Sequence, residues 1–201
     1  MLSPHLRRTW RLLLLYALLI FPLSFVLPYW TNVENGPIEN TQVLTLLGGC
    51  ALCLRYGCRA SRSFSRMWQS AAGVFLILAL RELSWGRVFF PLGHTETGEP
   101  ILMASADMPF HTEIHIAVGL AAALCLYGLA RYTPWRQVFH EIALPWRHFV
   151  LLVLCMAFVT LGDHHAMFHT LQDQTIEELS ELLLYLTLCH TAWYYHSHLE
   201  K

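Results

Sequence analysis

Two histidines four positions apart are the first residues in this chain that could do chemistry. His111 and His115 lie in the segment HTEIH, and residues four apart share one face of a helix. Two imidazoles on one helix face suit a single metal ion, and His with carboxylate is a usual ligand set for zinc. We therefore expect His111 and His115 to bind a divalent metal, with zinc the metal that this ligand set favours.

Further ligands of the same kinds occur where we expect a short loop to join two helices. Asp163, His164 and His165 begin this loop, and Glu177 follows it. Because the loop is short, the two helix ends must be neighbours, so any of these side chains could complete the metal site. A metal held there would activate water for hydrolysis or group transfer.

Four more charged residues lie at the ends of apolar segments, where a charge is costly unless it is paired or hydrated. Glu39 follows the turn sequence Asn-Gly-Pro, and Arg81 and Glu82 follow an apolar run. Glu181 is the deepest acid in the sequence, because three leucines come directly after it.

These four residues are the candidate catalytic residues. Glu39 or Glu181 could act as the base. Arg81 is the expected ion-pair hub for the surrounding carboxylates, beginning with Glu82. For Glu39 an alternative is equally open, since an acid in the first turn of a helix is stabilised by the helix dipole without any catalytic role.

The elements that must position these residues are apolar helices. Of the 201 residues, 55% are hydrophobic and only 13% are charged, which is about half the usual share of charged residues in a soluble domain. A transmembrane helix needs about 20 mostly apolar residues, and we predict an all-α integral membrane bundle that forms one domain. Its six transmembrane helices cover approximately residues 10–30, 37–54, 68–84, 110–130, 148–162 and 176–196.

The basic residues give this bundle an orientation. Only Arg81 and Arg87 of the 13 basic residues fall on one side of the six predicted spans. The side rich in Lys and Arg faces the cytoplasm, so we predict that both termini are cytoplasmic. Every candidate site residue then lies at the opposite, outer face. The net charge of −1 gives no electrostatic support for nucleic-acid binding, and the expected partner is membrane lipid.

Two short motifs at this outer face resemble those of known sequences. One is ExGxxE, from Glu34 to Glu39, which opens a predicted helix, and the other is RExxWGR, from Arg81 to Arg87, which closes the next. The pairing is similar to motifs of uncharacterised bacterial multi-pass inner-membrane proteins. The resemblance implies a bacterial inner-membrane location and no known activity. The alkaline-ceramidase-like membrane hydrolases also use His and Asp around zinc, but their Ser-containing motif and late HxxxH are not found here, so that similarity concerns mechanism only.

Several functions fit these features. The first is a metal-dependent hydrolase or transferase acting on a lipid or periplasmic substrate. The second is a non-catalytic membrane assembly partner, in which the polar residues form a structural ion-pair network. A transporter would need charges at mid-membrane, and the centres of the predicted spans are apolar. A haem role would need a histidine pair across the core, for which His148 and His190 are available.

Overall fold

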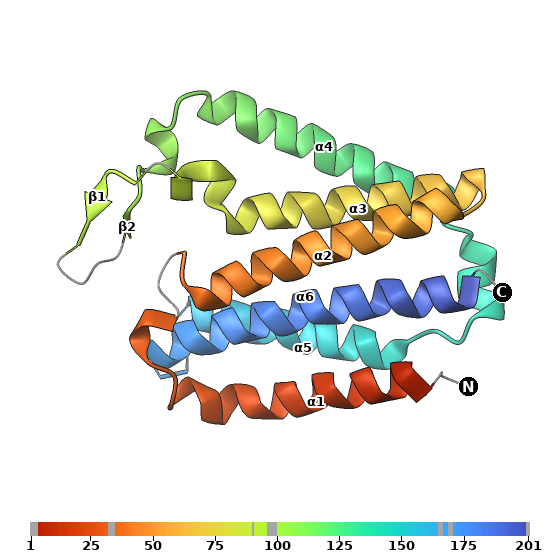
Figure 1. Cartoon of the computed structure of the whole chain (residues 1–201), viewed down its shortest axis with the longest axis horizontal. Coiled ribbons are helices and arrows are strands. Elements are labelled where there is room, and N and C mark those ends of the chain that lie inside the picture. The colour runs from red at the N-terminus through yellow and green to blue at the C-terminus, as the bar shows by residue number, and fades with distance from the viewer. Residues whose placement is uncertain are drawn as a thin grey trace. The chain divides into compact units, whose positions relative to one another are not determined.

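The computed structural model describes residues 4–31, 35–89, 91–95, 100–164, 167–168 and 171–199. This part of the chain is all-α, as predicted, apart from one pair of two-residue antiparallel strands, β1 (Gly93–His94) and β2 (Pro100–Ile101). Its six α-helices are α1 (Pro4–Ser24), α2 (Pro37–Arg59), α3 (Arg62–Glu82), α4 (His111–Tyr132), α5 (Trp146–Asp163) and α6 (Leu171–Leu199) (Figure 1).

The helices belong to two compact units. Unit 1 comprises Met1–Thr45 and Ile142–Lys201, and unit 2 comprises Leu46–Glu141. Helix α2 begins in unit 1 and continues into unit 2. The single domain predicted from the sequence would include both units.

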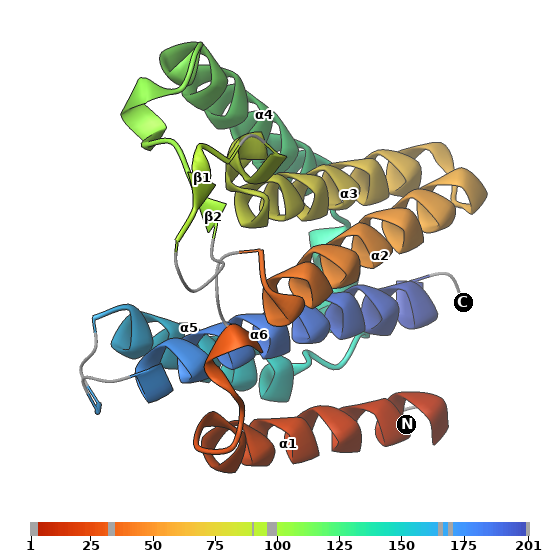
Figure 2. The ribbon, with the colours of Figure 1, turned by 60° about the vertical axis from the view of Figure 1, so that its left-hand side comes forward.

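Unit 1 is organised around α6. Helices α1 and α5 each pack along α6 (Figures 1 and 2). Apolar side chains from all three helices form its core, including Leu13 of α1, Cys155 of α5 and Leu183 of α6. One polar contact also joins α1 to α6, since the Tyr16 hydroxyl donates to the carbonyl oxygen of Leu179 at 3.2 Å. The contacts with α1 and α5 hold α6 in place and so fix where the polar residues on its first turns lie.

Unit 2 is built on the pairing of α3 with α4. The two helices approach closely where Gly128 faces Ser70 and where Gly73 faces Cys125, and a methyl group at either glycine would overlap these neighbours. Small residues at a helix–helix contact are typical of membrane helices, where close backbone approach replaces the hydrophobic driving force. A T-shaped contact between Tyr56 and Trp68, with ring centroids 5.2 Å apart, also joins α2 to α3.

The helix bounds differ from the predicted apolar runs at several ends. Helix α1 begins at Pro4 and ends at Ser24, and α6 begins at Leu171 rather than near residue 176. Hydropathy marks the apolar run, whereas backbone hydrogen bonding continues through polar residues such as those that open α6. At the other end of α1, Pro22 and Pro28 interrupt helical bonding, and a 3₁₀ turn follows at Tyr29–Thr31.

Two helices in the described part of the chain are long and apolar enough to cross a membrane, namely α4 and α5. Only 6% of the candidate span in α4 and 22% of that in α5 is buried, so neither resembles the buried core helix of a soluble protein. The other helices carry more charge or polar residues over comparable lengths. Membrane association is therefore indicated by two helices, and the six-span topology stays a prediction.

Candidate functional site

A buried amide joins α2 to α6 at the helix ends that carry the candidate carboxylates of unit 1. Gln42 Nε2 donates to the carbonyl oxygen of Glu178 at 2.9 Å and to its carboxylate Oε2 at 2.8 Å. Gln42 is fully buried, so these hydrogen bonds hold the two helices in a defined rotation. Gln42 was not among the residues predicted from the sequence, although an amide one turn after Glu39, at the start of an apolar run, is a usable signal.

Two acids of α6 are withdrawn from solvent. Asp173 is fully buried, and Glu181 is 7% exposed. Both oxygens of the Asp173 carboxylate accept the backbone N–H of Phe168, at 3.1 and 3.0 Å, which satisfies a donor ahead of the helix in the manner of a capping box. Asp173 therefore helps to start the helix. Glu181 lies about two turns further along α6, beyond the reach of the free N–H groups at the helix start.

The carboxylate of Glu39 is used at the start of α2. It accepts the backbone N–H of Asn35, a residue in the left-handed conformation with φ of 60°. Asn40 Nδ2 closes the same turn by donating to the carbonyl oxygens of Asn35 (2.8 Å) and Gly36 (2.9 Å). These contacts favour the helix-start role of Glu39 over the catalytic role considered for it.

The predicted metal ligands of unit 1 lie on two helices, at the end of α5 and near the start of α6. Asp163 and His164 are exposed at the end of α5, and Glu177 is half-buried on α6. Gly162 lets the two helices meet at this point, because a Cβ there would lie 2.7 Å from Cβ of Glu177 and 2.9 Å from the carbonyl oxygen of Asp173. His165, like Glu34 of the ExGxxE motif, lies outside the described residues.

In unit 2, Arg81 and Glu82 form an ion pair at the end of α3. Arg81 Nε lies 3.7 Å from Glu82 Oε1, with side-chain exposures of 54% and 6%. Solvent screens a pair with one exposed partner, so this contact by itself adds little stability. The chain then turns sharply, because Ser84, Trp85 and Gly86 all have positive φ.

His111 and His115 lie together on the first turns of α4, with ring centroids 4.3 Å apart. The pair therefore has the proximity that the spacing predicted. Among the described residues, however, no group of three or more His, Cys, Asp or Glu side chains could hold a metal ion. A structural zinc site needs four ligands and a catalytic one needs three from the protein, so the described residues do not complete one.

A second histidine pair lies inside unit 1, where the sequence did not fix a separation. His148 and His190 are both 5% exposed, and Nε2 of His148 lies 2.7 Å from Nδ1 of His190. Nε2 of His190 also contacts the hydroxyl of Thr9 at 3.0 Å, and the Trp10 ring packs against His148. A metal ion between two imidazole nitrogens would need about 2.0 Å to each of them, so the His148–His190 contact is a hydrogen bond and leaves no space for iron.

Comparison with known proteins does not identify the chain. No protein-family model matches it, and neither a curated protein nor a solved structure shows significant similarity to it.

Proposed function

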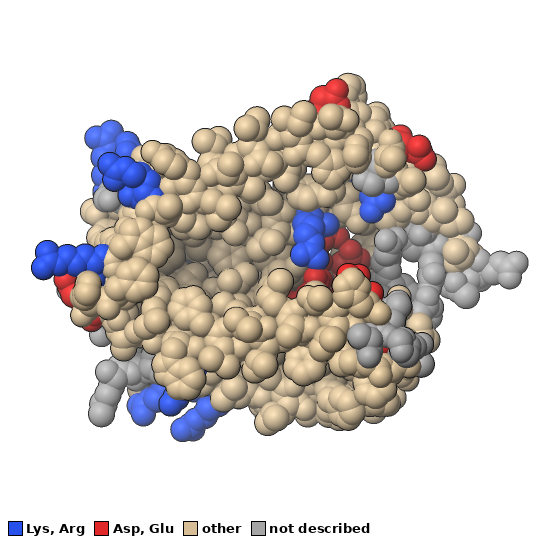
Figure 3. Space-filling view, turned by 180° about the vertical axis from the view of Figure 1, so that it is seen from behind, with Lys and Arg blue, Asp and Glu red and all other residues tan. Residues whose placement is uncertain are grey.

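We propose that this is a multi-pass membrane protein of the bacterial inner membrane with both termini in the cytoplasm. Helices α4 and α5 are long and apolar enough to span. Large apolar side chains are also exposed along α1, where Leu18 is 75% exposed, and such rows are unusual on soluble proteins. Most of the surface seen in Figure 3 belongs to residues other than Lys, Arg, Asp and Glu. Lipid is the medium in which these surfaces are stable.

Labelling of single cysteines tests this topology. In a cysteine-free background, a cysteine at Glu34 is expected to react with an impermeant maleimide added outside, and one at Arg62 only after the membrane is opened. Reaction of both positions from the same side contradicts the proposed topology.

We further propose that the protein is a hydrolase or transferase that acts on a membrane-borne, lipid-like substrate by acid–base catalysis. Glu181 carries this proposal, because it is an acid 93% withdrawn from solvent in a helix that continues with three leucines. Ionisable groups at such positions are costly to bury and mark functional sites in membrane proteins. Glu178 lies on the same helix as Glu181 and is hydrogen-bonded by Gln42 of α2, so it is a second carboxylate able to accept or give up a proton.

Lipid analysis tests this catalytic role. The purified protein is incubated with extracted inner-membrane lipids, which are then profiled by mass spectrometry. We expect the wild type to convert one lipid class and Glu181→Gln to lose that conversion. Glu113→Gln, a matched change at an exposed position of α4, should retain it. Identical profiles for the wild type and Glu181→Gln would instead favour the non-catalytic membrane partner.

A metal-assisted form of the same reaction is the second candidate, and the closeness of His111 and His115 favours it. Elemental analysis of protein purified without chelator tests this candidate. Stoichiometric zinc in the wild type and its loss in the His111→Ala, His115→Ala double variant would support it. Wild-type protein without stoichiometric metal would contradict it.

A further inference from the structure

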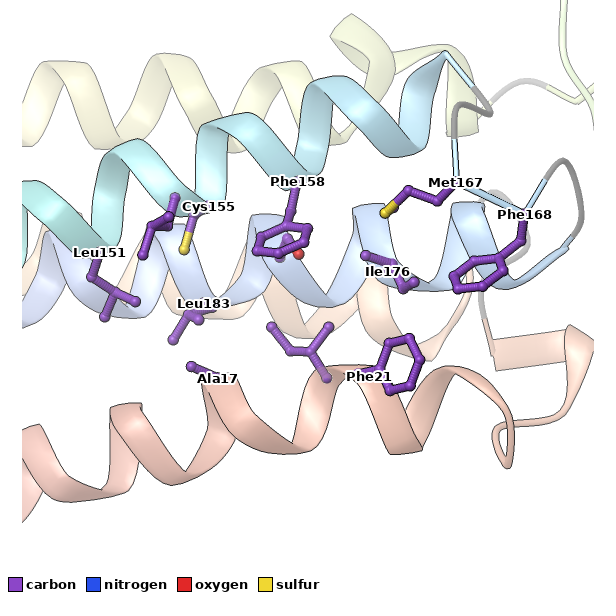
Figure 4. A pocket seen from close by; sticks show the side chains of 12 residues that line it. Ala17, Phe21, Leu151, Cys155, Phe158, Met167, Phe168, Ile176 and Leu183 are labelled. Atoms are coloured by element: carbon purple, nitrogen blue, oxygen red, sulfur yellow. The ribbon is translucent and has the colours of Figure 1, made fainter.

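Unit 1 contains a cavity of about 280 Å³ between α1, α5 and α6 (Figure 4). Its walls are almost entirely apolar, with Ala17 and Phe21 contributed by α1 and with Leu151, Cys155 and Phe158 contributed by α5. None of these residues belongs to the carboxylate site, which comprises the α6 acids Asp173, Glu178 and Glu181. The cavity is therefore a separate feature of the same unit.

The cavity is elongated along the helices. On α5 its lining extends from Leu151 to Phe158, and on α6 from Ile176 to Leu183. Seven residues of helix rise by about 10 Å, so both walls run for roughly this length. Phe168 lies at one end of the lining and Leu151 toward the other (Figure 4). An extended hydrocarbon chain fits a slot of this shape and polarity better than a compact or polar molecule does.

One polar group interrupts the apolar lining. Ser180 is 1% exposed, and its hydroxyl has no hydrogen-bond partner among the described residues. Other hydroxyls of α6 behave differently, because Thr175 and Thr187 donate to the carbonyl oxygens four residues earlier, at 3.0 and 2.8 Å. A buried hydroxyl without a partner is destabilising, and an oxygen of a bound molecule would remove that penalty.

The cavity also adjoins the carboxylate site. Phe168, at its end, is the residue whose N–H is bound by the buried carboxylate of Asp173. Ser180 precedes Glu181 directly on α6. A chain lying in the cavity would therefore place its polar end toward the part of α6 that carries the acids.

We propose that this cavity binds the hydrocarbon chain of a lipid, with an ester or carboxyl oxygen accepting a hydrogen bond from Ser180. As a binding site it depends on the proposed membrane location. As the place where a substrate is held, it rests on the proposed function of the carboxylate site. The lipid is a long-chain acyl compound, whose source is either a glycerophospholipid or a free fatty acid.

Photo-crosslinking in reconstituted vesicles tests this binding site. One set of vesicles contains a phosphatidylglycerol with a diazirine in its acyl chain, and another contains a diazirine fatty acid. Labelling is mapped by mass spectrometry in the wild type, in Ala17→Trp, which fills the cavity, and in Ser180→Ala. Leu18→Trp is the matched control, because Leu18 is 75% exposed on the same helix.

We expect labels on buried cavity residues such as Leu151 and Leu183 in the wild type and in Leu18→Trp. Labelling should fall at least tenfold in Ala17→Trp and about fivefold in Ser180→Ala, the factor expected for one lost hydrogen bond. The set of vesicles that gives the cavity label shows whether the bound hydrocarbon chain belongs to a glycerophospholipid or to a free fatty acid. Labels confined to outward-facing residues such as Val153, or unchanged in both cavity variants, would overturn the binding site.

The same experiment separates this proposal from the catalytic one. Glu181→Gln should keep the cavity label even though it is expected to lose lipid conversion. A label without any conversion by the wild type would leave the cavity as a lipid site and refute the enzyme. Conversion that persists in Ala17→Trp would show that the substrate chain does not lie in the cavity.

Discussion

Replacing Gly162 by alanine should disturb the junction of α5 and α6 that places the acids of unit 1. The new Cβ would lie 2.7 Å from Cβ of Glu177, 2.9 Å from the carbonyl oxygen of Asp173 and 3.2 Å from Cα of Glu177. Ordinary van der Waals contacts between such atoms are about 3.5–4.0 Å, so α5 must move by up to about 1 Å relative to α6. Two of the three atoms are backbone atoms, so a change of side-chain rotamer cannot relieve the overlap.

The size of the effect follows from two opposing contributions. Overpacking of this kind typically costs about 1–3 kcal/mol. Alanine is favoured over glycine within a helix by about 0.5–1 kcal/mol, which offsets part of that cost. We therefore expect Gly162→Ala to lower the free energy of unfolding by up to about 2.5 kcal/mol. Gly119→Ala, at a helical position where a Cβ meets nothing within 4 Å, should raise it by up to about 1 kcal/mol.

Thermal unfolding of the two variants in the same detergent measures this difference. Gly162→Ala should melt below the wild type, and Gly119→Ala should melt at or above it. Equal melting temperatures for the two variants would refute the argument, because they would mean that α5 and α6 do not approach as closely as the structure has them. The same result would remove the basis for placing Glu177 and Asp173 beside the end of α5.

Three other substitutions test separate contacts. Gln42→Leu should destabilise the protein by about 1–3 kcal/mol because Glu178 loses its buried amide partner. Gln174→Leu, at an exposed position, should change the free energy of unfolding by less than about 0.5 kcal/mol, and equal effects of the two changes in chemical denaturation would contradict the contact. His148→Leu should lower the free energy of unfolding by about 1–3 kcal/mol because His190 loses a buried hydrogen bond. The double variant with His190→Leu should lose less than the sum of the two single variants, and strict additivity would contradict the pairing. Gly128→Ala should destabilise the α3–α4 pair by about 1–3 kcal/mol through overlap with Ser70, and Ser70→Gly should restore part of the loss in the same melting assay.

The all-α class could be predicted from the sequence because long apolar runs leave few alternatives in a chain with so little charge. Helix ends were harder to predict, as α6 shows. Its first turn contains Gln172 and Asp173, which a hydropathy pattern assigns to a loop. The fully buried Asp173 belongs to the helix because its carboxylate satisfies the Phe168 N–H, a contact that depends on how the loop folds back.

The candidate site could be predicted only in its local parts. The i, i+4 spacing of His111 and His115 gives their proximity directly, since both lie on one helix. His148 and His190 lie on different helices, and a sequence does not contain the rotation of one helix about its axis relative to another. Ser180 was missed for the same reason, because nothing in its sequence neighbourhood distinguishes it from the helical hydroxyls that donate to their own backbone.

Helix α6 connects these observations, because successive residues on it face different partners. The Glu178 carboxylate accepts a hydrogen bond from Gln42 of α2, and the Leu179 carbonyl oxygen accepts one from the Tyr16 hydroxyl of α1. Ser180, the next residue, lines the cavity. A rotation of α6 by even one residue, about 100°, would break the first two contacts and turn Ser180 away from the cavity. The contacts that stabilise unit 1 therefore also set the direction of Ser180 and Glu181. Loss of either the Gln42–Glu178 or the Tyr16–Leu179 hydrogen bond should therefore weaken binding of the lipid's hydrocarbon chain even in protein that stays folded.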